Sequence, residues 1–145
     1  MAAKTGSGFS DAERQAMKAR AKELAAEQRS SKKREDGEKA VRNAIAEMKG
    51  SDRTMAKRIH ELVSEVAPHL WPKTWYGMPA YANKDGKVIC FFQAAGKFES
   101  RYASFGFNDV AKLDDGNMWP VSFALVKLTK AEEKLITDMV LKAVS

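Results

Sequence analysis

The chain has 145 residues, of which 44% are hydrophobic and 30% charged, a composition that indicates one folded domain with room for a tail rather than a disordered chain or a coiled coil. It contains no run of 18 apolar residues, its first eight residues lack the apolar core of a signal peptide, and its one cysteine excludes an internal disulfide and a cysteine-based zinc site. We therefore expect a cytoplasmic protein with no membrane partner.

Positive charge is concentrated near the N-terminus. Residues 14–34 contain eight basic and two acidic residues, so this stretch carries a net charge of +6, which equals the formal net charge of the whole chain. Ser10 and Glu13 have the spacing of a capping box, and the residues that follow favour helix, although their apolar stripe is thin. We expect residues 1–35 to form a basic helical arm that is mobile or loosely docked.

Two amphipathic helices are expected after a break that extends through Gly37. Apolar residues recur at helical spacing up to Gly50. Ser51 is then expected to cap a second helix, which has the stronger apolar stripe, lies against the sheet and ends at Pro68.

The pattern changes to that of strands at Trp71. Twelve of the 13 aromatic residues lie between Trp71 and Phe123, so the core is expected there. Turn signals separate four expected strands, the first interrupted near Gly77, over residues 74–82, 87–92, 98–105 and 122–128. A second capping box at Thr129 begins a closing helix. This order predicts an α+β fold in which helices pack on one face of an antiparallel sheet.

Catalytic motifs are incomplete in this sequence. His60 and Glu61 begin like a zinc-protease motif, but position 64 is Ser64 instead of the second histidine that the metal needs. We interpret His60 as a half-exposed helical residue. Cys90 lies in an apolar strand without a neighbouring cation, which predicts a buried, inert thiol with a raised pKa. The domain is therefore expected to be non-enzymatic.

Two pairs of carboxylates are weak candidates for binding a hard cation such as ferrous iron. Glu61 and Glu65 are four residues apart and share a helix face, and Asp114 and Asp115 are adjacent in a turn sequence. The same residues also fit a solvated helix face and an ordinary turn, so both interpretations stay open.

The strands carry more aromatic and methionine side chains than are needed to pack one face of a sheet. Most are expected in the core, and the remainder leaves room for a pocket that suits a small anionic or planar ligand, with Lys97 or Arg101 at its rim. The candidate pocket residues are Trp75, Tyr76, Met78, Tyr81, Lys97, Tyr102 and Trp119.

The basic arm has two interpretations, one as a binding segment for nucleic acid and one as a solubilising tail. Its cations can contact nucleic-acid phosphates in a salt-dependent, sequence-independent way. The candidate residues are Lys18, Lys22, Arg29, Lys32, Lys33 and Arg34. No aromatic residue interleaves these cations, so base stacking is not expected from the arm. A solubilising tail is the competing interpretation.

The segment Lys73–Tyr81 reads Lys-Thr-Trp-Tyr-Gly-Met-Pro-Ala-Tyr and is followed by a turn, the strand Lys87–Phe92 and a turn that contains Lys97. This arrangement resembles the signature of the YdhG-like family, also described as domain of unknown function 1801, and the run Leu113–Pro120 resembles a subgroup of it. The resemblance covers roughly residues 52–144. We therefore expect the basic arm over residues 1–35 and a YdhG-like α+β domain over residues 36–145.

The resemblance implies a frataxin-like sandwich of helices on an antiparallel sheet. One branch of the family acts as a frataxin-like iron chaperone, which implies iron delivery for iron–sulfur cluster or haem assembly, with assembly proteins as partners. Frataxins bind iron through an acidic ridge, whereas this chain is basic overall, so no metal ligand is carried over. We expect an accessory iron-handling domain, with phosphate binding by the arm or a small-ligand module as alternatives.

Overall fold

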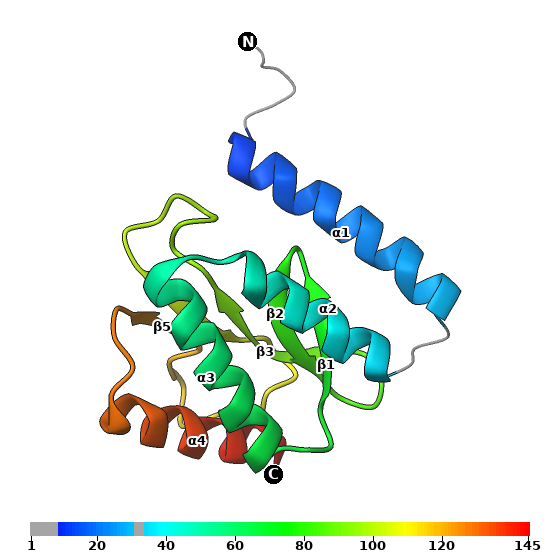
Figure 1. The fold of residues 1–145 in the computed structure, drawn as a ribbon. Helices are drawn as coiled ribbons and strands as arrows, with labels where there is room; N and C mark the ends of the chain where they lie inside the picture. Colours follow the sequence, from blue (N-terminus) through cyan, green and yellow to red (C-terminus); the bar gives the residue numbers. More distant parts are fainter. Residues whose placement is uncertain (1–8, 31–33) are drawn as a thin grey trace.

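Within the described residues, the fold consists of four helices and a five-stranded sheet (Figure 1). The computed structural model describes residues 9–30 and 34–145, and the side chains of residues 27–30 lie outside the described part. The elements are α1 (Asp11–Ser30), α2 (Arg34–Glu47), α3 (Gly50–Val66), β1 (Trp71–Trp75), β2 (Met78–Ala82), β3 (Val88–Gln93), β4 (Ala103–Phe107), β5 (Ser122–Leu125) and α4 (Lys130–Val144). The strands pair antiparallel in chain order, which confirms the expected α+β class.

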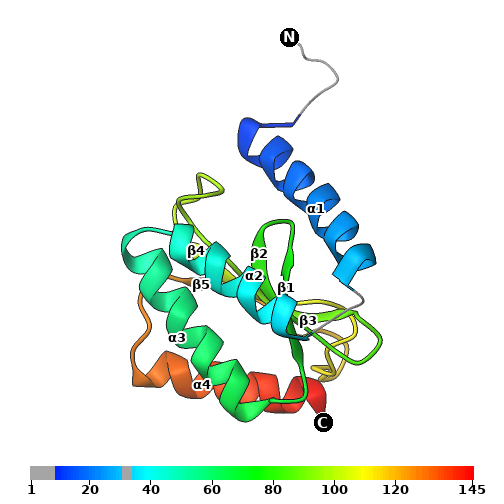
Figure 2. The same ribbon diagram turned by 45° about the vertical axis from the view of Figure 1, so that its right-hand side comes forward.

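Helices α2 and α3 cover one face of the sheet, and α4 packs against α3 and β3 (Figure 2). Tyr81, Phe92 and Phe105 of the sheet are almost fully buried and share one hydrophobic core with Ile59 and Val63 of α3. We call the opposite face, turned away from α2 and α3, the open face of the sheet. No helix within the described residues is long and apolar enough to span a membrane.

The expected break does separate α1 from α2, but it does not extend through Gly37, because α2 begins at Arg34 and contains that residue. The glycine marks a close approach between helix and sheet. A Cβ at position 37 would lie 2.0 Å from the carbonyl oxygen of Pro72 in β1. Only a residue without a side chain lets α2 pack this closely on the edge strand.

The cap expected at Ser51 is also wrong. Helix α3 begins at Gly50, and its N-cap is Lys49, whose side chain makes no capping hydrogen bond. The backbone enters the helix through an extended Lys49 and a positive φ of 57° at Gly50, a conformation that glycine adopts without strain.

The strand expected over residues 74–82 is in fact a hairpin. Tyr76 and Gly77 both have positive φ, 53° and 79°, and form the two-residue turn between β1 and β2. Pro79 is tolerated although β2 is an inner strand, because the β2–β3 ladder starts only at Ala80.

The strand expected over residues 98–105 begins later, at Ala103. The preceding segment is a turn held by Asp52 of α3, whose carboxylate accepts hydrogen bonds from the amides of Ala95 (3.2 Å) and Gly96 (2.9 Å). Because β4 starts at Ala103, which pairs with Leu125, β5 has no partner beyond that residue and ends there instead of at residue 128.

Both expected capping boxes are confirmed. The amide of Ser10 donates to Glu13 Oε1 (2.8 Å) and the amide of Glu13 donates to Ser10 Oγ (3.1 Å). Thr129 and Glu132 make the same reciprocal pair at the start of α4. Local sequence therefore determines where these two helices begin.

His60 is buried, so the expectation of a half-exposed residue is wrong. Its Nε2 lies 2.8 Å from a carboxylate oxygen of Glu38 in α2, and its Nδ1 lies 2.9 Å from the hydroxyl of Tyr81 in β2. A carboxylate only accepts hydrogen bonds, so Nε2 donates and, in the neutral ring, Nδ1 accepts from Tyr81. His60 therefore links α2, α3 and the sheet through both of its ring nitrogens.

Cys90 is buried as expected, and burial raises the pKa of its thiol far above the usual range. The thiol is therefore protonated and unreactive at neutral pH.

We expect Gly37→Ala to lower the free energy of unfolding by about 1–3 kcal/mol, because the new methyl group would clash with the Pro72 carbonyl. In an exposed helix the same change is normally stabilising. Chemical denaturation measures the difference, with Asn43→Ala on the exposed side of α2 as the control. Equal or greater stability of Gly37→Ala would contradict the close approach.

Candidate ligand site on the open face of the sheet

Three aromatic side chains form a connected cluster at one end of the open face. The ring centroids of Trp75 in β1 and Phe91 in β3 are 5.2 Å apart, although β2 lies between these strands. The ring of Tyr76 meets that of Trp75 edge-on at 5.1 Å. We call Trp75, Tyr76 and Phe91 the aromatic platform.

Small residues beneath the rings allow the platform to form. Ala80 is directly opposite Phe91 and fully buried, so no large side chain of β2 separates the two flanking rings. Gly106 in β4 is the other neighbour of Phe91, and a Cβ there would lie 2.6 Å from the Phe91 ring. The ring therefore lies low over β4 instead of standing upright.

Helix α1 is docked on the turn that ends at this platform. The carboxylate of Glu23 accepts hydrogen bonds from the amides of Tyr76 (2.9 Å) and Gly77 (2.7 Å). The guanidinium of Arg20 lies 5.6 Å from the centroid of the Tyr76 ring. Lys97 Nζ donates a hydrogen bond to the carbonyl of Gly77 in the same turn (3.1 Å). Of the two states expected for the arm, mobile or docked, the structure has α1 docked.

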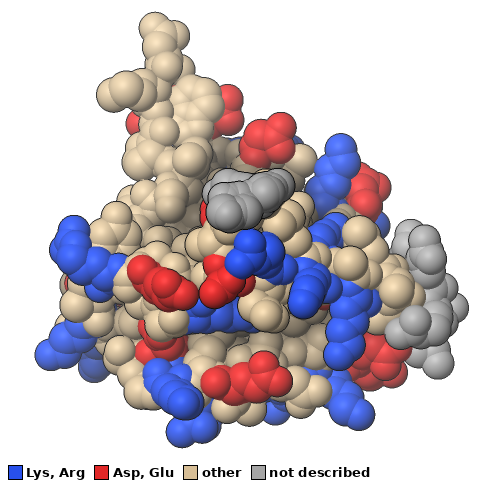
Figure 3. All heavy atoms as spheres, turned by 90° about the horizontal axis from the view of Figure 1, so that it is seen from above, with Lys and Arg blue, Asp and Glu red and all other residues tan. Residues whose placement is uncertain are grey.

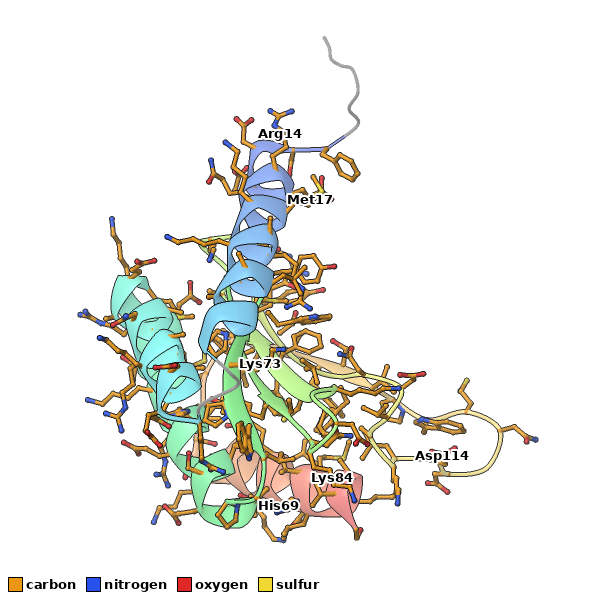
Figure 4. All side chains as sticks on the ribbon, turned by 90° about the vertical axis from the view of Figure 1, so that its right-hand side faces the viewer. Arg14, Met17, His69, Lys73, Lys84 and Asp114 are labelled. Carbon is orange, nitrogen blue, oxygen red and sulfur yellow. The ribbon has the colours of Figure 1, made fainter. Side chains whose placement is uncertain are left out.

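A groove of about 410 Å³ lies beside the platform, between α1, the β2–β3 turn and the segment after β4. Figure 4 shows Lys73, one of its lining residues, below α1. Three cations, one carboxylate, one carboxamide and apolar groups line it: Arg20, Lys73, Lys87, Asp109, Asn108, Trp75, Val88, Val110 and Gly86. An aromatic wall next to cations suits a ligand that combines a planar ring with negative charge.

The structure brings together only two of the seven predicted pocket residues, Trp75 and Tyr76. Met78 is buried, and Lys97 is bonded to the turn. Tyr102 is exposed under the guanidinium of Arg101, at 5.1 Å.

The last two predicted pocket residues belong to the hydrophobic core. Tyr81 lies on the opposite face of the sheet, bonded to His60, and burial raises the pKa of its hydroxyl. Trp119 packs against the same core, half-buried.

Sequence reasoning missed most of the groups at this site, including Lys73. Arg20 is one of many cations in the arm, and only the fold places it over Tyr76. Phe91 looks like its buried neighbour Phe92, although strand alternation puts the two rings on opposite faces. Lys87 and Asn108 carry no local signal, because they reach the groove from two separate turns.

The four metal candidates do not form one cluster. Glu61 is paired with Arg58 at 3.0 Å, and Glu65 is exposed on the same helix. Asp114 and Asp115 are exposed on the segment between β4 and β5, where Figure 4 shows Asp114 far from α3. Within the part of the chain that the structure describes, no three His, Cys, Asp or Glu side chains gather where they could hold a metal ion.

The basic candidates of the arm fall into three groups. Lys18 and Lys22 are exposed on α1. Arg34 donates a hydrogen bond of 2.7 Å to the carbonyl of Pro68 and so ties the start of α2 to the end of α3. The side chains of Arg29, Lys32 and Lys33 lie outside the described residues.

Comparisons with known proteins give no relative from which function can be transferred. No protein-family model matches the chain, and neither a curated protein nor a solved structure matches it significantly. The resemblance to the YdhG-like family therefore stays a prediction.

We expect Glu23→Ala to release α1, because the two turn amides lose their acceptor. Two hydrogen bonds to a carboxylate shift the equilibrium between docked and released α1 by about tenfold or more. The hydrogen-exchange protection of α1 amides is therefore expected to fall by about the same factor. Gln15→Ala, at an exposed position of the same helix, is the control. Unchanged protection in Glu23→Ala would show that other contacts hold the helix.

Proposed function

We propose that this domain binds, without converting it, a ligand that combines a planar ring with an anionic group. The ring stacks on the aromatic platform, and the anion lies among the cations of the groove. The observation that carries this proposal is the placement of Arg20, Lys73 and Lys87 around the groove that Trp75 lines.

Physical magnitudes support a ligand of this kind. Stacking of a base on an aromatic side chain contributes about 1–3 kcal/mol, and the volume of the groove is within the usual range for small-ligand sites. Asn108 adds a carboxamide that can both donate and accept hydrogen bonds at the ring edge. The site is open to solvent, so its charge interactions are expected to weaken as salt rises.

Titrations with AMP, adenosine and inorganic phosphate test the planar ring and the anionic group of the proposed ligand separately. We expect AMP to bind more tightly than either part alone in calorimetric titrations. Trp75→Leu is expected to weaken AMP binding about tenfold or more, through lost stacking. Lys87→Gln is expected to weaken AMP binding about two- to fivefold and to leave adenosine binding unchanged.

Lys84→Gln is the matched control, because Lys84 is an exposed cation in the same β2–β3 turn but does not line the groove. Figure 4 shows Lys84 at the lower end of the molecule. Equal losses in Lys84→Gln and Lys87→Gln would mean that only net charge matters. AMP binding that survives Trp75→Leu unchanged would place the ligand elsewhere.

Iron delivery is the function that the resemblance implies, and it stays a prediction. The motif Lys73–Tyr81 that carries the resemblance forms the β1–β2 hairpin, which provides two rings of the platform. Partnership with iron–sulfur assembly proteins has the same basis. Cytoplasmic location, which was expected from the lack of a signal peptide and of a long apolar run, also stays a prediction.

Anaerobic titration of ferrous iron into the full chain tests this role directly. Iron handling predicts saturable binding that weakens in Glu61→Gln/Glu65→Gln or in Asp114→Asn/Asp115→Asn. The variant Trp75→Leu is the control, because it alters the groove and no candidate ligand. Absence of binding to the wild-type chain would remove the iron role and leave the groove proposal untouched.

A further inference from the structure

We infer that the ligand of the open face is single-stranded nucleic acid, whose bases stack on the aromatic platform while its phosphates follow the cations of the groove and of α1. This inference rests on the proposed function and names the class of its ligand. It depends on three observations: the positive charge of α1, the exposure of cations along that helix, and the position of cations next to the aromatic rings.

Helix α1, which forms one side of the groove, carries part of the positive charge of the chain. The stretch 14–34 accounts for the whole formal charge of +6, and basic and acidic residues balance elsewhere. Helix α1 makes up most of this stretch and contributes Arg20 to the groove. A polyanion is therefore attracted to α1, the helix that docks on the turn of the platform.

Helix α1 presents further cations along its outer surface. Arg14, Lys18 and Lys22 recur every four residues, so they share one face, and all three are exposed. They extend over about 12 Å of helix axis. Arg14 is paired with Asp11, and no ion pair of Lys18 or Lys22 occurs within the described residues. Figure 3 shows many Lys and Arg side chains, interspersed with Asp and Glu, on the face of the molecule seen from above.

The fold interleaves cations and aromatic rings that the sequence keeps apart. The arm contains no aromatic residue between positions 10 and 34, which argues against stacking when only the sequence is considered. In the structure Arg20 lies over Tyr76, and Lys73 and Trp75 line one groove. Alternation of rings and cations on an open surface is typical of sites for single strands.

The distance between these features favours a strand over a mononucleotide. The groove lies at the docked side of α1, whereas Lys18 and Lys22 are on its outer side, and a helix with side chains is about 10 Å across. One nucleotide that stacks on Trp75 does not extend around the helix, but a chain of several nucleotides does. In a duplex the bases are stacked on each other, so the half-buried ring of Trp75 has no base to receive.

Fluorescence anisotropy with a labelled mixed-sequence RNA of about 16 nucleotides tests the inference on the full chain. We expect the single strand to bind at least tenfold more tightly than AMP and than the same RNA annealed to its complement. The DNA strand of the same sequence is measured in parallel and is expected to bind, because stacking and phosphate contacts need no 2′-hydroxyl.

Two double variants separate phosphate contacts from general charge. Lys18→Gln/Lys22→Gln removes two exposed cations of α1, and Lys130→Gln/Lys142→Gln removes two exposed cations of α4. Both lower the net charge equally and alter only exposed side chains. We expect the α1 variant to reduce the slope of log K against log salt concentration by about 1.4, and the α4 variant to leave it unchanged.

The outcomes distinguish failure of the single-strand inference from failure of the proposed function. AMP binding as tight as that of the strand would overturn the inference and leave the proposed function in place. Equal binding of the duplex, or equal slopes for the two double variants, would also overturn it. Loss of AMP and RNA binding together in Trp75→Leu, with full salt dependence in the α4 variant, supports both.

Discussion

The two-residue turn at Tyr76 and Gly77 is the constraint on which the candidate site depends. Left-handed backbone at both positions reverses the chain within two residues and directs both amides away from the sheet. Glu23 accepts both amides, and Lys97 donates to the Gly77 carbonyl. One turn therefore joins β1 to β2, docks α1, and connects the β3–β4 turn to the same corner of the molecule.

The two faces of the sheet use aromatic residues differently. Tyr81, Phe92 and Phe105 fill the core under the helices, where burial of ring area stabilises the fold. On the open face, Trp75 and Phe91 lie over small residues and keep part of their surface exposed. Antiparallel sheets tolerate such a solvated face, because their connections do not have to cross it.

Local patterns predicted the class of the fold and several of its boundaries. The Ser10 and Thr129 capping boxes and the burial of Cys90 followed from the identities of near neighbours. The α+β order followed from the change of hydrophobic period at Trp71. These features depend on contacts within a few residues, which a sequence displays directly.

Features that depend on distant partners could not be predicted in the same way. In the sequence Gly37 resembles a helix breaker, and its role becomes clear only from its contact with Pro72. His60 resembles a surface residue, and its role becomes clear only from the hydrogen bonds of its ring with Glu38 and Tyr81. The site has the same character, because Arg20 lies 56 positions before its partner Tyr76. Composition located the cations and the rings, and only the fold placed them side by side.

The docking of α1 by hydrogen bonds has a thermodynamic consequence. Ala16 is the one apolar side chain of α1 that is buried among those described, while Met17 and Leu24 are 40% and 46% exposed. Release of the helix therefore exposes little apolar surface, and its heat-capacity change is small compared with that of the core. Warming weakens this attachment without the compensating hydrophobic term that supports the core. Arg20 therefore lines the groove only while α1 is docked, and the docking equilibrium of α1 is separate from the unfolding of the core. Temperature can alter ligand affinity through this equilibrium while the sheet and its other helices stay folded.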